Sequence, residues 1–413
     1  MTQYPILEIC ARVEGHPVQW QILRQHCRQF KDWQDMLKYA EREGMAPLLR
    51  KHLLESGADI PTTTRRSLSI LHQRHQKKAA VRLTVLGELL VLLQQHQITP
   101  ILIKGAALCQ TLYPDPALRP MRDIDILLSR DEVDQAQELL RNVGFTQSTA
   151  AISPDHYHLP SLQKTVEDVQ VCIELHRGLY PNCPPYYPKV DFNNLLQSGR
   201  KITIGGTEVA TFNHEETLHY LYQHGFRSPL TYEKFKLVNA ADIIGFTEAY
   251  FQEIDWQRVQ KQYPQLYKAL PLMHHISPWN FEKIPESFIS LQNRKRRLPP
   301  RPFNGWPQRR VKELQRTTTL KNVLKATLLP SHWWLGVYYG AGYSTGKYIK
   351  ALCFSHLKNI FWWLHMYTPV ANEKDTASIA ADKKFAGPLR LSFITRFNRA
   401  CGMLAKLKNL RKS

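Results

Sequence analysis

The stretch "IKGAALCQTLYPDPALRPMRDIDILL", residues 103–128, decides the fold of this chain. Its second half places Asp123 and Asp125 on either side of an isoleucine in an otherwise apolar run. Positions i and i+2 of a strand point to the same face, so both carboxylates project together while Ile124 projects into the core. Two carboxylates this close repel one another, and one resists ionisation without a compensating cation. A divalent ion such as Mg²⁺ resolves the conflict, because it takes carboxylate oxygens together with substrate phosphates.

The first half of the stretch predicts a phosphate-binding turn. Lys104 and Gly105 end a short apolar run that is typical of a strand. A glycine directly after a strand lets backbone N–H groups come close to a phosphate, and Lys104 adds a positive charge. Arg119 and Arg122 follow in a proline-rich loop, where a guanidinium can bind phosphate oxygens in a bidentate manner.

A third carboxylate lies on a later predicted strand, "VEDVQVCIELHRGL". Apolar and polar residues alternate in it, so Glu174 and His176 share the polar face. If this strand lies beside the Asp-x-Asp strand, Glu174 completes a metal site and can take a proton from an incoming nucleophile. An isolated Asp-x-Asp also occurs at strand ends and in turns, and a lone histidine is often a satisfied core residue. The order of the three signals favours one active site.

The hydrophobic patterns divide the chain into five regions. Residues 1–98 are expected to be helical, and residues 99–210 to form a mixed α/β core. Helices return over 211–290, and a basic arm follows over 291–330. Residues 331–413 form an aromatic and basic C-terminal tail.

The composition favours anionic partners, because the 413 residues carry a net charge of +20. The seven cysteines are odd in number and contain no Cys-x-x-Cys, so we expect reduced thiols in a cytoplasmic protein. The N-terminal residues do not resemble a signal peptide. No stretch reaches the roughly 18 apolar residues of a membrane span.

Along the chain, a glycine follows a strand, an Asp-x-Asp lies on the next strand, and a third acid lies on a later strand. This order resembles that of the nucleotidyltransferase superfamily, which includes DNA polymerase beta, poly(A) polymerase and the aminoglycoside nucleotidyltransferases. The matching pieces are Ile103-Lys104-Gly105-Ala106, Asp123-Ile124-Asp125 and Glu174. More narrowly, the chain is similar to a bacterial nucleotidyltransferase family with an "LKG…DxDLL" block, over about residues 30–345. Further matches to that family are Glu174-Leu175-His176, His219, His224, Lys236, Leu237, Asp242 and Ile243.

The resemblance implies an α+β fold, with a polymerase-beta-like mixed-sheet core flanked by N-terminal and C-terminal helical regions. It implies a metal-dependent enzyme that transfers a nucleoside monophosphate from an NTP, expected to be ATP, to a hydroxyl of a small molecule, glycan precursor or protein. Asp123, Asp125 and Glu174 would be catalytic and would hold Mg²⁺ or Mn²⁺. The residues expected to bind the nucleotide are Lys104, Gly105, Ala106, Arg119, Arg122, His176 and Lys236.

Two other functions stay open at this point. Ala106 stands where the superfamily has serine or glycine, and the loop before Asp123 is long. These two departures leave open a catalytically inactive binding or membrane-associated module. A nucleic-acid-modifying enzyme would suit the net charge, but no RNA-binding motif supports it. The tail could contact an anionic membrane, at the inner face, through Trp333, Trp334, Trp362 and Trp363.

Overall fold

The computed structural model describes residues 5–148, 156–180, 190–227, 236–288, 328, 330–341 and 344–360. The chain divides into two compact units, Met1–Ala351 and Leu352–Ser413, and the features below belong to the first. The second unit is described only over 352–360, where the π-helical segment η3, Ala351–His356, ends. Almost all of the predicted basic arm, together with Trp362 and Trp363, lies outside the described residues.

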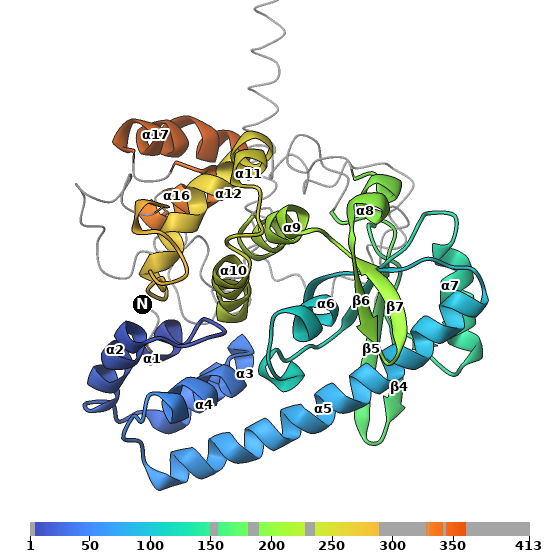
Figure 1. Ribbon diagram of the computed structural model, residues 1–413, viewed down its shortest axis with the longest axis horizontal. Coiled ribbons are helices and arrows are strands. Elements are labelled where there is room, and N and C mark those ends of the chain that lie inside the picture. The colour runs from blue at the N-terminus through green and yellow to red at the C-terminus, as the bar shows by residue number, and fades with distance from the viewer. Residues whose placement is uncertain are drawn as a thin grey trace, which may run out of the picture. The chain divides into compact units, whose positions relative to one another are not determined.

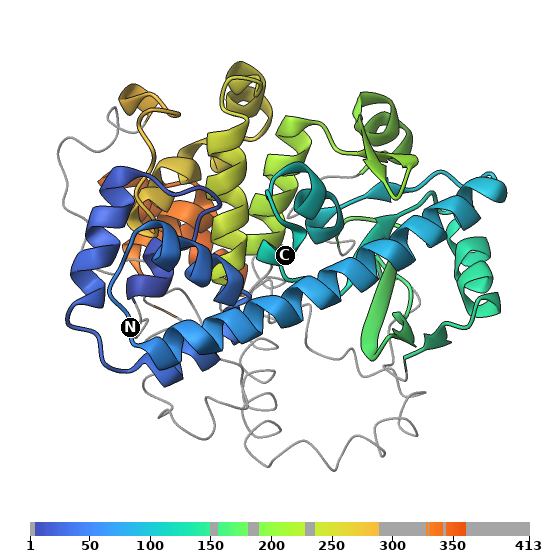
Figure 2. The same cartoon turned by 60° about the horizontal axis from the view of Figure 1, so that its bottom comes forward.

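The N-terminal region is helical, as predicted. The break expected near Gly44 occurs there, at a φ of +70° that glycine adopts without a Cβ clash. Figures 1 and 2 show the longest helix running from the other N-terminal helices to the sheet. The helices are α1 (Pro5–Ile9), α2 (Pro17–Cys27), α3 (Trp33–Glu43), α4 (Ala46–Glu55) and α5 (Thr62–Gln95).

The core is a seven-stranded mixed sheet of order β3-β4-β5-β2-β1-β7-β6. β2 pairs antiparallel with β1 and parallel with β5, and β1 pairs parallel with β7. This confirms the α+β class, with the Asp-x-Asp strand at the centre of the sheet. The strands are β1 (Ile101–Leu102), β2 (Ile124–Leu127), β3 (Thr146–Gln147), β4 (Leu162–Val166), β5 (Val169–His176), β6 (Arg200–Ile204) and β7 (Thr207–Thr211).

Apolar side chains cover both faces of the sheet. On one face, Ile124, Ile126 and Ile173 join a core cluster with the apolar residues of α5 and of α7 (Val133–Asn142). On the other face, Leu127 joins a smaller cluster with side chains of α8 (Phe192–Ser198) and α9 (His214–Phe226). Each fully buried residue of this size contributes about 1.5–3 kcal/mol, so the alternation along β2 is strongly specified.

Two elements begin at residues other than those predicted. The expected strand through Gly105 stops at Leu102, and α6 (Lys104–Thr111) starts two residues later because Ala106, Ala107 and Leu108 pack helically into the core. Ser129 and Glu132 have the sequence spacing of a capping box, but that box does not form. The Ser129 hydroxyl instead donates to the Glu132 side chain at 2.6 Å, and α7 begins at Val133. A short 3₁₀ helix, η1 (Pro116–Leu118), lies in the loop before β2.

The C-terminal part of the first unit is helical. The sequence places Asn213 three residues before Glu216, a spacing that predicts a helix cap, and the Asn213 side chain accepts from the Glu216 N–H at 2.9 Å. The further elements are α10 (Leu237–Ala249), α11 (Trp256–Gln262), α12 (Pro264–Ala269), η2 (Leu270–His275), α16 (His332–Tyr339) and α17 (Thr345–Lys350).

The tryptophan pair of α16 belongs to the protein core. Trp333 is fully buried and its Nε1 donates to the Leu272 carbonyl oxygen at 2.8 Å. Trp334 is also buried and stacks on Tyr338. These two side chains are therefore not available as surface anchors. Among the helices that the structure describes, none combines the length and apolarity needed to cross a bilayer.

Buried His52 should make stability fall in acid. Its Nε2 donates to the Arg12 carbonyl oxygen, its Nδ1 makes no hydrogen bond among the described residues and lies 3.9 Å from the Glu55 carboxylate, and burial lowers its pKa to about 3. An unfolded histidine takes up a proton near pH 6.5, so only the unfolded state binds that proton between pH 6.5 and 3. The free energy of unfolding should fall over this window by up to about 1.4 kcal/mol per pH unit for this residue.

Urea unfolding of the His52→Gln variant at pH 7, 6 and 5 measures this effect. We expect a shallower decline than in the wild type. The matched control is His26→Gln, which removes an exposed imidazole and should keep the wild-type decline. Equal slopes for wild type and His52→Gln would contradict the assignment.

Candidate active site

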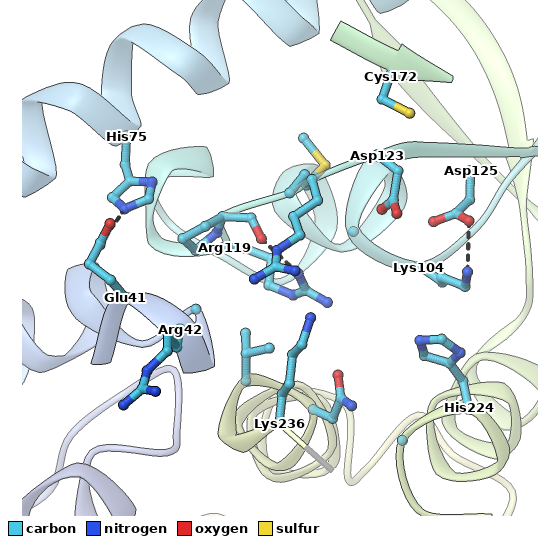
Figure 3. Close-up of a pocket in the computed structure, with 18 of the residues that line it drawn as sticks. Glu41, Arg42, His75, Lys104, Arg119, Asp123, Asp125, Cys172, His224 and Lys236 are labelled. Atoms are coloured by element: carbon cyan, nitrogen blue, oxygen red, sulfur yellow. Dashed lines mark hydrogen bonds and ion pairs between the residues drawn. The ribbon is translucent and has the colours of Figure 1, made fainter. Parts of the chain in front are cut away.

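The two aspartates of the Asp-x-Asp pair line one cavity. Asp123 directly precedes β2 and is partly exposed, whereas Asp125 lies within β2 and is 2% exposed. Both carboxylates face the same cavity (Figure 3), while Ile124 and Ile126 are buried in the core on the opposite face. The predicted alternation of this strand is confirmed.

Glu174 lies directly beside Asp125, because the parallel register of β2 and β5 pairs these two residues. Asp125, Glu174 and His176 each offer a ligand atom, and these atoms lie within 4.8 Å of one another. Asp123 is not part of that group, and Glu174 and His176 do not line the cavity that contains the aspartates. Asp125 is therefore the carboxylate common to both arrangements, since it shares the cavity with Asp123 and is paired with Glu174 across the strands.

The Asp125 carboxylate is held by the side chains of Lys104 and His176. The Lys104 Nζ lies 2.7 Å from its Oδ1, and the His176 Nε2 lies 2.8 Å from the same oxygen. Burial alone would raise the pKa of Asp125, but Lys104 and His176 outweigh it and hold that pKa well below its ordinary value. Burial opposes the charge of Lys104 too, yet Tyr220 and Asp125 leave the Lys104 pKa raised. The pair is therefore ionised.

The neighbouring groups respond to Asp125 in different ways. Burial raises the pKa of Asp123, and the charges of Asp125 and Glu174 add to that rise. The bond from His176 lowers the pKa of Glu174 against the effect of burial. Burial would lower the pKa of His176, but its bonds to Asp125 and Glu174 outweigh this and raise it. Among these three carboxylates, only Asp123 has a raised pKa. A further cation would therefore favour the ionisation of Asp123 most.

These residues fit a divalent cation. Asp123, Asp125 and Glu174 offer the carboxylate oxygens that Mg²⁺ prefers. His176 adds an imidazole nitrogen close to the same oxygens, a ligand better suited to transition metals.

The turn before α6 carries backbone strain at Lys104. Its φ is +51°, in the left-handed region, which costs a non-glycine residue about 1–2 kcal/mol. This conformation takes the chain from Ile103 into the helix and directs the Lys104 side chain to Asp125. Gly105 lies in the first turn of α6, where a Cβ would approach the Met121 Cγ to 2.9 Å. Close packing therefore requires glycine there, and the unusual φ falls on Lys104.

The guanidinium of Arg119 is engaged within the protein. Its Nε and Nη2 each donate to the Asp242 carboxylate at 2.8 Å, and its Nη1 donates to the Pro120 carbonyl oxygen. The Tyr113 hydroxyl donates to the same carboxylate at 2.7 Å. Arg119 thus ties the loop before β2 to α10, and its fork is not free for the bidentate phosphate contact that we expected.

The other predicted nucleotide contacts differ in accessibility. Ala106 is buried in the core and does not line the cavity, so its side chain cannot contact a nucleotide there. Arg122 is exposed and lines the cavity. Lys236 precedes α10 and points into the cavity from that side (Figure 3).

The cavity has a volume of about 880 Å³ and two contrasting walls. One wall combines the sheet and α6, through Asp123, Asp125, Cys172, Lys104 and Gly105. The opposite wall comes from the N-terminal helices and is rich in nitrogen donors. Its side chains from α3 and α5 are Glu41, Arg42, Arg74, His75, Lys78 and Arg82.

The residues of that second wall were not among those predicted from the sequence. A usable signal was present, because residues 60–87 contain no aspartate or glutamate while Arg74, Lys78 and Arg82 recur every four residues. Such spacing places the three cations on one face of a helix. What the sequence did not show is that this face of α5 lies opposite the aspartates.

Comparison with known proteins gives one family and two structures. The model of a family described as "Uncharacterised nucleotidyltransferase" matches residues 30–274, more than half of the chain. No curated protein matches the sequence. A lincomycin-bound lincosamide antibiotic adenylyltransferase, LnuA, is 16% identical, with 39% of this chain and 94% of that chain covered and a TM-score of 0.27. An antigenic nucleotidyltransferase-like protein from Paracoccidioides brasiliensis is 18% identical, with 50% and 98% covered and a TM-score of 0.31.

The Arg119–Asp242 pair should matter for stability. The Asp242→Ala variant leaves a largely buried guanidinium without its carboxylate, which should cost about 3–5 kcal/mol. The control is Glu208→Ala, which breaks the exposed pair with Lys201 and should cost at most about 1 kcal/mol. Chemical denaturation of both variants measures the difference, and similar losses would show that Asp242 has no special structural role.

Proposed function

The chain belongs to the family of uncharacterised nucleotidyltransferases, and from this membership we propose that it transfers a nucleoside monophosphate from an NTP to a hydroxyl acceptor. The observation that carries the proposal is the pairing of Asp125 with Glu174 on adjacent strands, with Lys104 of α6 on the same carboxylate. We propose ATP as the nucleotide. The acceptor class is a small molecule, a glycan precursor or a protein.

The triphosphate would lie at the start of α6. The first N–H groups of a helix have no partner within the helix, and they favour a phosphate. Lys104 and Lys236 add positive charge around this position, since both line the cavity with Gly105. Arg122 is a further phosphate contact at the same cavity.

Asp123, Asp125 and Glu174 would hold a divalent cation, Mg²⁺ or Mn²⁺. When bound, that ion supplies positive charge that offsets the triphosphate and the three carboxylates. His176 is a positioning residue in this scheme, because it is buried and its Nε2 holds the Asp125 Oδ1.

The reaction is an in-line displacement at the α-phosphorus. The acceptor oxygen forms a bond to that phosphorus, and the bond to the bridging oxygen of the β-phosphate breaks. Pyrophosphate leaves with the bonding electrons. The proton of the acceptor hydroxyl passes to the Glu174 carboxylate, whose lowered pKa keeps it ionised and ready to accept. The protein contributes chiefly positioning and charge neutralisation.

The second candidate function is that of a nucleotidyltransferase-fold module that binds its ligand but does not catalyse transfer. The observation in its favour is that the Lys104 ammonium already occupies the Asp125 oxygen that a metal would need. The next two experiments separate the candidates, since the module would bind without transferring a nucleotide.

ATP with MgCl₂ should raise the melting temperature of the wild type. At a ligand concentration about 100-fold above the Kd, binding stabilises by about 2.7 kcal/mol. The Asp123→Asn/Asp125→Asn variant should lose the shift. The matched control is Asp131→Asn/Asp134→Asn, which removes the same charge from exposed positions outside the cavity. An equal shift in the site variant would show that nucleotide binds elsewhere.

Transfer can be followed by incubating the protein with α-³²P-labelled NTPs and a cell extract, and by identifying the labelled product. The Glu174→Gln variant should reduce the labelling rate by about 10²–10⁴-fold while ATP still raises its melting temperature. The exposed Glu138→Gln variant should label at the wild-type rate. Absence of any transfer by a wild type that binds ATP would favour the non-catalytic module.

A further inference from the structure

One face of α5 presents a row of cations to the cavity. Arg74, Lys78 and Arg82 are spaced four residues apart and all line it. Like charges at this spacing destabilise a helix by a few tenths of a kcal/mol per pair. The stretch 60–87 contains no acidic residue that would offset them. The row therefore has a structural cost that a bound anion would remove.

Within the described part of the chain, these cations differ in their partners. Arg74 and His75 both contact the Glu41 carboxylate, so the far end of the row is largely neutralised. No carboxylate of the described residues forms a salt bridge with Lys78, Arg82 or Arg42.

The two remaining cations of α5 are short of acceptors. Burial lowers the pKa of Lys78, and the charges of Arg74 and Arg82 lower it further. The Arg82 Nη2 donates to the Gln170 carbonyl oxygen at 3.2 Å, while its Nε is buried without a partner among the described residues. A buried donor of this kind costs about 1–3 kcal/mol until an acceptor is supplied.

The row lies at the opposite end of the cavity from the start of α6. In Figure 3, Lys104 and His224 lie with the two aspartates at the right, and His75, Glu41 and Arg42 lie at the left. Burial lowers the pKa of Arg82, and the nearby charge of Asp123 partly opposes that shift. Gln170 and Cys172 of β5 line the cavity there.

In-line displacement places the incoming and leaving oxygens on opposite sides of the phosphorus. If pyrophosphate leaves at the Lys104 side, the acceptor enters from the α5 side. Cys172 is two residues before Glu174 on β5, a separation of about 7 Å along the strand. A small molecule in this cavity can place an anionic group at α5 and a hydroxyl beside the two aspartates, which line the same cavity.

We infer that Lys78 and Arg82 form a subsite for the phosphate group of a phosphorylated small-molecule acceptor. The inference rests on the proposed function and narrows its acceptor to a phosphate ester. Two cations on one helix face suit a phosphate dianion better than a single carboxylate, and Arg82 retains donors for its oxygens. The enclosing cavity suits a small acceptor.

The same cations could instead hold the β- and γ-phosphates of the nucleotide. A competition experiment distinguishes the phosphate of an acceptor from the phosphates of the nucleotide. The probe is inorganic phosphate, titrated by calorimetry into the full-length protein with and without a saturating non-hydrolysable ATP analogue and Mg²⁺. A separate subsite should bind phosphate in both cases. Loss of phosphate binding in the presence of the analogue would assign the cations to the triphosphate and overturn the inference.

Variants locate the subsite. Lys78→Gln should weaken phosphate binding at least tenfold, and Lys78→Gln/Arg82→Gln further, while the affinity for the analogue changes less than threefold. The matched controls are Lys77→Gln and Lys77→Gln/Arg66→Gln, which remove equal charge from exposed positions of α5 outside the cavity. Equal weakening in variant and control, or equal weakening of phosphate and analogue by Lys78→Gln, would contradict the inference.

Titration of the analogue alone distinguishes the two proposals. A wild type that binds the analogue but binds no phosphate contradicts only the subsite. A wild type that binds phosphate through Lys78 but binds no nucleotide contradicts the proposed function, and the acceptor assignment falls with it. Retained melting temperatures in all variants exclude unfolding as the cause of lost binding.

Discussion

The ionised carboxylate of Asp125 is the constraint on which the site depends. A charge this deeply buried is tolerated only with partners, and Lys104 and His176 supply them on a single oxygen. Each partner comes from a different element, one from the start of α6 and one from the end of β5. The need to satisfy Asp125 therefore fixes how α6 and β5 meet β2, and it explains why Lys104 accepts an unfavourable backbone conformation.

The cavity couples this carboxylate group to the N-terminal helices. α5 contributes apolar side chains to the core under the sheet and cationic side chains to the wall facing Asp123. A helix that serves both purposes keeps the distance between the two walls constant, because shifting it would disturb the core. Arg119 and Asp242 act similarly on another side, where they join the loop before β2 to α10.

Local patterns in the sequence were enough to predict the sheet centre. Alternation along residues 169–176 and the Asp-x-Asp spacing specify which side chains share a face, whereas the pairing of β2 with β5, left as a condition by the sequence, is settled by the structure. The start of α6 was missed because Lys104 and Gly105 resemble a strand end, and only tertiary packing shows that Ala106 and Leu108 are buried on a helix. The engagement of Arg119 by Asp242 joins residues 123 positions apart, which no local pattern reveals. The burial of Trp333 against η2 is another long-range contact.

The continuity of α5 has a consequence for how substrate preference can change. Its 34 residues run uninterrupted from the N-terminal helices to the sheet. Exchanging the N-terminal region as a block would strip apolar cover from the sheet along with the cationic row. Changes to the proposed α5 subsite would therefore come from individual substitutions along one side of this helix, each about 6 Å from the next, and not from recombination of modules.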